Sequence, residues 1–334
     1  MNRRSWSLVI MSALLVLSLT LAGGCAPEEE PPPPPPPVDD EPEVEEPDGL
    51  RLAIVEEWLE SGHANVLPFP AGREGCVLCH DGGAFAQEID DPAALDREFL
   101  VSIDCRACHV GVGPEIAAAG VVDLPATDNV QAGSGALCMS CHNARRAPDP
   151  ADDGRAAPHY SAQADVLTAS GGMPFEGIEY ASSEPHETFI DTCLGCHIET
   201  HAFHVSYGSC QAAECHTTDI DLDTPAEADY DGDGEVGSFQ QEVEGLLAML
   251  EDALVDELDG GSFAVEAGAI SFLDAAGDPI EVDDRVYAAA YNHVLAAADG
   301  SLGIHNPAFV ISILQESFSW LTGEEHPGEP YVVE

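Results

Sequence analysis

The sequence predicts a mainly α-helical protein with long irregular loops and little sheet. Four stretches place apolar residues on one helical face, near residues 50–61, 238–258, 283–298 and 307–321. No stretch of useful length alternates apolar and polar residues as a strand would. Only 6% of the residues are aromatic, so side chains alone offer little material for a large apolar interior.

Residues 1–24 predict a secretory signal. Two arginines precede an apolar run from Leu8 to Leu21, and small residues follow. The run is short for a transmembrane span and ends in glycines, which disfavours that alternative. The small residues lead directly to Cys25, as in a lipoprotein signal, although plain secretion stays open because Ala22 is not the commonest residue at its position. We therefore expect an extracytoplasmic protein that lipid on Cys25 anchors to the membrane, facing the periplasm or the cell surface.

Residues 25–48 are rich in proline and acidic side chains and include seven consecutive prolines from Pro31 to Pro37. Such a segment cannot bury a core, and polyproline geometry with carboxylate repulsion keeps it stiff and extended. We expect a stalk that holds a domain away from the membrane, and a disordered tail is the alternative. Residues 49–334 are expected to form that domain, with a helical C-terminal part over 238–321.

A pair of cysteines followed directly by a histidine occurs five times in the chain. Four pairs have two residues between the cysteines, and the fifth has four. We number these sites 1 to 5 in chain order: Cys76, Cys79 and His80; Cys105, Cys108 and His109; Cys138, Cys141 and His142; Cys193, Cys196 and His197; Cys210, Cys215 and His216.

This pattern predicts five haem c groups. In a haem c site two thiols bond to the haem vinyl groups, and the histidine that follows binds the iron from one face as its proximal ligand. A disulfide framework would use the same ten cysteines, but it does not explain a histidine after every pair when only 13 of 334 residues are histidine. Zinc ligands would group into tetrahedral sets, which five repeated units do not. The haems would fill the interior, so we expect a haem-packed fold that depends on haem insertion.

A closed haem electron carrier needs a second, distal ligand on each iron, and eight histidines lie outside the five sites. Of these, His204 is a reserve, and His293 and His326 are expected to face solvent. The five favoured distal ligands are His63, His159, His186, His201 and His305.

The local sequence supports each of the five. His63 ends an apolar helix, and a proline restrains the backbone before both His159 and His186. His305 precedes an Asn-Pro pair that is typical of a helix start. His201 follows the site 4 histidine by four residues, so on a helix the two would share a face and could not bind opposite sides of one iron. We therefore expect His201 to serve a different haem.

The chain resembles the multihaem c-type cytochromes related to the pentahaem nitrite reductases and the octahaem reductases. The likeness covers roughly residues 155–321, and the segment Trp58 to His63 is similar to the distal-ligand helix that opens many multihaem cytochromes. It rests on His159-Tyr-Ser-Ala-Gln163, Ser183-Glu-Pro-His186, sites 4 and 5, His201-Ala-Phe203, Tyr291-Asn292 and Ser301-Leu-Gly-Ile-His305-Asn-Pro307.

The resemblance implies that His305 is a distal haem ligand, because the histidine of the last motif has that role in the group. The chain departs from the group at two points. The nitrite reductases bind their catalytic haem through a Cys-x-x-Cys-Lys motif, and this chain contains no lysine, which puts nitrite reduction in doubt. The longer gap at site 5 affects only the geometry of that haem.

An acidic loop after site 5 has the beginning of a calcium-binding pattern. Its acids and a glycine occupy the first positions of a calcium loop: Asp229, Asp231, Asp233 and Glu235. The twelfth position holds Gln240 rather than glutamate, so calcium binding would be weak. A solvated acidic turn that leads into the next helix is the alternative.

The chain has 62 acidic residues against 10 basic ones, a formal net charge of −52. Repulsion disfavours nucleic acid and anionic membrane surfaces as partners. A redox partner protein with a basic docking surface fits this charge, and adaptation to a salty habitat is the alternative explanation.

The sequence therefore predicts an extracytoplasmic pentahaem cytochrome c that carries electrons from haem to haem. The first alternative is a reductase of a small nitrogen or sulfur oxyanion, which requires one iron with an open coordination position. The second alternative is a subunit of a cytochrome filament, in which copies of the chain stack haem to haem.

Overall fold

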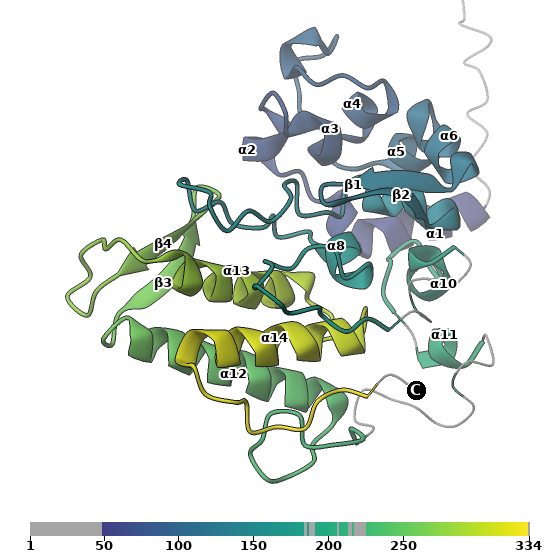
Figure 1. Cartoon of the computed structure of the whole chain (residues 1–334). Coiled ribbons are helices and arrows are strands. Elements are labelled where there is room, and N and C mark those ends of the chain that lie inside the picture. Colours follow the sequence, from purple (N-terminus) through teal and green to yellow (C-terminus); the bar gives the residue numbers. More distant parts are fainter. Residues whose placement is uncertain are drawn as a thin grey trace, which may run out of the picture. The chain divides into compact units, whose positions relative to one another are not determined.

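The computed structural model describes residues 49–183, 186, 191–205, 207–212, 216 and 225–332 (Figure 1). The predicted signal, the stalk, Cys25 and the site 5 cysteine Cys215 lie outside these residues. All described residues belong to the unit that runs from Pro47 to Glu334. Within this part of the chain, no helix has the length and apolar character needed to cross a membrane.

The described residues are mainly helical, and the attachment motifs lie on or beside very short helices. A helical turn brings residues three apart onto one face, so both thiols of a Cys-x-x-Cys pair point the same way. The motif helices are α3 (Val77–His80), α5 (Cys105–His109), α7 (Ala136–Met139), α10 (Cys193–His197) and α11 (Tyr207–Ala212). The other short elements are η1 (Gly62–Ala64), α2 (Pro68–Ala71), α4 (Gly82–Ala86), η2 (Pro92–Ala94), α6 (Val112–Ala119), η3 (Gly133–Gly135) and α8 (Gln163–Leu167).

The four helices expected from apolar periodicity are confirmed. They are α1 (Gly49–Glu60), α12 (Phe239–Glu257), α13 (Asp284–Asp299) and α14 (Pro307–Thr322). Their ends follow local chemistry: Ser238 forms a capping box with Gln241 at the start of α12, and Asn306 caps α14 ahead of a proline. Gly300 and Gly323 end α13 and α14 in the left-handed conformation that glycine adopts without strain.

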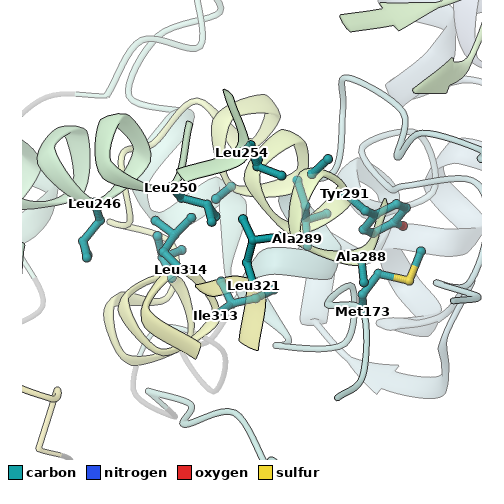
Figure 2. Packing of buried hydrophobic residues seen from close by; sticks show 14 of the residues in the cluster. Met173, Leu246, Leu250, Leu254, Ala288, Ala289, Tyr291, Ile313, Leu314 and Leu321 are labelled. Atoms are coloured by element: carbon teal, nitrogen blue, oxygen red, sulfur yellow. The ribbon is translucent and has the colours of Figure 1, made fainter. Parts of the chain in front are cut away.

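Helices α12, α13 and α14 pack against one another around the larger apolar cluster (Figure 1). Figure 2 shows Leu246, Leu250 and Leu254 of α12 facing the other two helices, with Leu314 of α14 among the side chains that meet them. Each of these leucines is almost fully buried, and such burial stabilises the fold by about 1.5–3 kcal/mol per side chain. The periodic leucines therefore hold these three helices together.

A buried amide ties an irregular loop to this helical core. Asn292 of α13 accepts a hydrogen bond from the Met173 backbone amide at 2.7 Å and donates to the Tyr180 and Ser317 hydroxyls. Asn306 does the same for the following segment, because it accepts from Ser183 N and donates to a backbone carbonyl near the end of α8. These bonds fix the loop that leads toward site 4.

Two antiparallel hairpins correct the expectation that no useful alternating pattern exists. The first pairs β1 (Val121–Leu124) with β2 (Thr127–Gln131), and the second pairs β3 (Ser262–Glu266) with β4 (Ala269–Leu273). Phe263 lies opposite Phe272 and Val265 opposite Ile270, so alternate residues face the core. The two-residue turn at Ala267 and Gly268 has positive φ at both positions, as the tightest hairpin turn requires.

Candidate functional site

Cysteines of different attachment sites lie side by side. The Cys79 thiol of site 1 donates to the Ser140 carbonyl within site 3 at 3.9 Å, and it lies close enough to the Cys141 thiol for each to shift the pKa of the other. The thiols of Cys138 in site 3 and Cys193 in site 4 are close enough for the same effect. The nine attachment cysteines within the described residues form no disulfide. Site 3 therefore lies between sites 1 and 4, and three motifs that are far apart in the sequence converge.

Four attachment histidines each face a histidine from elsewhere in the chain. Every ring pair joins one attachment histidine to one of the predicted distal ligands, with ring centres 6.0 to 6.3 Å apart. The pairs are His142 with His63 at 6.0 Å, His80 with His159 at 6.1 Å, His197 with His305 at 6.2 Å and His216 with His186 at 6.3 Å.

This separation fits a metal ion between the two rings of each pair. A metal–imidazole bond is about 2 Å long, and the ring centre lies about 1 Å beyond the nitrogen, so two imidazoles on opposite faces of one metal stand about 6 Å apart. The interplanar angles of 47° to 69° exclude parallel stacking. The four pairs can thus clamp four metal centres from both sides.

Hydrogen bonds fix which nitrogen of each ring is left free. Nδ1 of His142 lies 3.1 Å from Gln163 Oε1, and Nδ1 of His305 lies 2.5 Å from Asp299 Oδ1. Nδ1 of His186 and Nδ1 of His197 face the backbone carbonyls of Ile304 and Phe203 at 2.8 and 3.1 Å, and Nδ1 of His159 faces the Ser161 hydroxyl at 2.8 Å.

A carbonyl or carboxylate oxygen only accepts, so Nδ1 carries the proton in the four rings that face one, and Nε2 keeps its lone pair there. These rings are His142, His186, His197 and His305. Metal-binding histidines are typically held in this way, because an acceptor on the far nitrogen orients the ring and strengthens its donation. The distal and proximal rings of site 4 both show this arrangement. The imidazoles are therefore prepared as ligands through Nε2.

Burial keeps several of these rings uncharged. It lowers the pKa of His63 to about 4, with a further contribution from the charge of His142, and it lowers the pKa of His159 to about 4, with the charge of Arg145 adding to the effect. His305 differs, because the hydrogen bond and charge of Asp299 outweigh burial and raise its pKa. Neutral imidazole is the form that binds a metal, so the pairs with a lowered pKa are ready to do so at neutral pH.

Arg145 offers an anion site beside sites 1 and 3. Its charge acts on Cys79, His80 and His159, and its Nε is buried without a hydrogen-bond partner. An orphaned guanidinium donor is costly unless an anion meets it. A haem carries propionate groups, and Arg145 is placed to hold one of them.

The remaining histidines have other surroundings. The His201 backbone amide donates to Glu57 Oε2 at 3.0 Å, and His201 Nδ1 lies 3.5 Å from the same oxygen, so this ring faces no attachment histidine. His204 is exposed. The expectation that His293 and His326 face solvent is wrong, because His293 packs against Phe263 and buries its Nδ1, and His326 is buried against Phe318.

The acidic loop brings its three aspartates together. Oxygens of Asp229, Asp231 and Asp233 lie within 4.8 Å of one another. Asp229 accepts bonds from the backbone amides of Gly232 and Gly234, as in a tight acidic turn. Gln240 at the twelfth position donates to the Ser301 carbonyl instead of facing the loop, so nothing in this position supplies the bidentate ligand of a calcium loop.

Several residues of the site escape prediction from sequence. Gln163 and Arg145 meet rings or thiols from distant segments, whereas Asp299 reaches His305 from the end of the preceding helix. Gln163 bonds His142 on one side and the Asp299 carbonyl on the other, so it connects site 3 to the end of α13. A residue spacing within one segment could not have revealed such a bridge.

Comparisons of the chain with protein-family models, with curated proteins and with solved structures found no match.

Proposed function

We propose that the chain is an extracytoplasmic pentahaem cytochrome c that carries electrons from haem to haem. The four ring pairs carry this proposal, since each joins a Cys-Cys-His motif to a second histidine at the spacing that a six-coordinate iron needs. Once bound, a haem supplies one-electron redox chemistry. Accidental histidine contacts would have no reason to select an attachment histidine four times.

The residues that would hold the haems follow from the pairs. At site 1 the thiols and His80 would act with His159, at site 3 His142 with His63, at site 4 His197 with His305, and at site 5 His216 with His186. Arg145 would hold a propionate beside sites 1 and 3. A haem-packed interior then explains why the part of the chain around the motifs has only a small apolar cluster of its own.

The order of the sites suggests a route for electrons. Thiol contacts connect site 1 to site 3 and site 3 to site 4. His186 of site 5 lies beside His305 of site 4, and the charge of His305 contributes to the lowered pKa of His186. The Nδ1 atom of His186 also bonds the carbonyl of Ile304, the residue before His305. Haems on these motifs would form a continuous series in the order 1, 3, 4, 5.

The location and partners belong to the same proposal. A lipid on Cys25 would anchor the protein to the membrane, and the stalk would extend the haem domain toward the periplasm or cell surface. The net charge of −52 favours redox partners with a basic docking surface.

Replacement of His305 by alanine tests the ligand pairs. The variant should keep all five covalent haems and gain one high-spin iron that binds cyanide, because Asn306 anchors the helix start and no other histidine faces His197. Electron paramagnetic resonance and haem mass provide the readouts. His204→Ala is the matched control, because His204 is exposed and should leave the spectrum unchanged. An unaltered spectrum in His305→Ala would remove His305 from the ligand set.

A further inference from the structure

Site 2 differs from the other attachment sites in its exposure. Cys105 and Cys108 are exposed, as is His109, whereas every other described attachment cysteine is partly buried. His109 also lacks a facing ring among the histidines of the chain, all of which are described. Four attachment histidines have a partner, and the fifth does not.

The surroundings of His109 fix the end of helix α5, on which this histidine lies. The Asp104 side chain caps α5 by accepting from Arg106 N at 3.0 Å. The turn after His109 requires Gly111, which has a φ of +64° and whose added Cβ would lie 1.7 Å from the Ala86 carbonyl oxygen. Close backbone packing against α4 therefore fixes the end of α5.

No unpaired histidine is presented to this site. The His201 ring is held by Glu57 and lies against Phe203, with its side chain 35% exposed. His293 and His326 are packed into the helical part of the chain. A histidine would have to leave these contacts before it could reach the open face of site 2.

We propose, given the proposed haem function, that the haem of site 2 has an open distal position that binds a small neutral ligand from solution. The neutrality of the ligand follows from the charges of the chain and of the motif. The net charge of −52 repels anions, and the cation within the motif, Arg106, is committed to Asp104 through bonds of 2.6 to 3.1 Å. Nearby Arg97 has a buried Nε without a hydrogen-bond partner, but its guanidinium is paired with the fully buried carboxylate of Asp81, which balances its charge. Diatomic ligands such as carbon monoxide and nitric oxide belong to the class that binds ferrous haem without needing a counter-charge.

This position is connected to the other sites. The partly buried thiol of Cys138 in site 3 lies close to Cys193 and close enough to Cys108 of site 2 for the charge of Cys108 to raise its pKa further. Site 3 in turn contacts sites 1 and 4. The haem of site 2 would therefore join the series of sites 1, 3, 4 and 5 at site 3, and a ligand of site 2 would bind at the exposed end of this side connection.

Titration of the reduced full-length protein with carbon monoxide tests the proposal. Dilute monomeric protein should bind one carbon monoxide per five haems, and the oxidised protein should show one high-spin iron. His201→Ala should leave both results unchanged, with His204→Ala as the exposed control. Binding of no carbon monoxide by the wild type, or its first appearance in His201→Ala, would overturn the open position.

Two further variants assign the ligand to site 2. Cys105→Ser removes one thioether bond and should shift the absorption band of the haem that responds to carbon monoxide, whereas Cys193→Ser should shift a band that does not respond. The reverse result would place the open iron elsewhere. Carbon monoxide binding that disappears when the protein is concentrated into assemblies would show a second copy's histidine at this position and overturn the small-ligand site. If the motif peptides carried no haem, the proposed haem function itself would be wrong. That result differs from a protein with five haems of which none binds carbon monoxide, which would contradict only the open position at site 2.

Discussion

The imidazoles of the ring pairs differ in what accepts their Nδ1 proton. His142 faces an amide oxygen, and His186 and His197 face backbone carbonyls, all of them neutral acceptors. His305 faces the fully buried carboxylate of Asp299 at 2.5 Å, which also accepts from the Ser301 hydroxyl. A charged acceptor pushes more electron density onto the ring and thus onto a bound iron, which stabilises the oxidised state.

Replacing Asp299 by asparagine should therefore raise the midpoint potential of one haem. The amide oxygen can still accept from His305 Nδ1, so the geometry is kept while the charge is removed. A tenfold change in the ratio of reduced to oxidised haem, which corresponds to about 59 mV for a one-electron couple, is the expected scale. Spectroscopic redox titration of all haems measures it.

Asp284→Asn is the control for this measurement. Asp284 lies at the opposite end of the same helix, is 67% exposed and pairs with Arg155 rather than with a histidine. All potentials should stay within error in this variant. Equal shifts in the two variants would show that Asp299 acts only through overall charge and not through His305.

At the scale of elements, apolar periodicity was sufficient to locate the long helices but not the hairpins. Helix α12 buries one regular face, and α14 is buried around most of its circumference, so the apolar residues of both helices mark them in the sequence. The hairpin of β3 and β4 has the alternating pattern, but it is short and lies between helices, and its buried residues are those of β4. A short alternating run is weak evidence until its partner strand is known.

The same contrast applies to the site. The spacing of cysteines and histidines marks the five motifs without any structure, because covalent attachment of haem would impose that spacing. Which distal histidine meets which motif depends on long-range folding, so His63 pairs with site 3 although site 1 is nearer in the sequence. The sequence favours His201 as a distal ligand, but its backbone bonds Glu57 of helix α1, which is distant in the chain.

A core substitution separates the helical part from the attachment sites. Leu250→Ala should lower the free energy of unfolding by about 2–5 kcal/mol, because Leu250 is fully buried among α12, α13 and α14. Glu244→Ala on the exposed face of α12 should change it by less than about 0.5 kcal/mol. Both variants should keep the wild-type haem content, measured by absorbance, since neither residue lies near a motif. Loss of haem from Leu250→Ala would show that the helical part is needed for haem attachment.

For the whole molecule, we expect charge to govern how redox partners approach. A net charge of −52 creates a long-range negative field that ions screen. Electron transfer to a small basic redox protein should therefore be fast at low ionic strength and slow as salt is added, as stopped-flow absorbance would record. A small acidic redox protein should show the opposite dependence. If the electron-transfer rates with both partners did not change with salt concentration, docking by charge would be contradicted.

Peptide-resolved mass spectrometry tests the central claim most directly. The protein should be produced in a host that attaches haem c and digested without reduction. We expect haem on each of the five motif peptides, with both cysteines of every pair bonded to it. The adjacent thiols offer a clear contrary result, because Cys79 lies beside Cys141 and Cys138 beside Cys193. Haem-free peptides joined by disulfides between these partners would show that the motifs form a disulfide framework, and would contradict the cytochrome assignment.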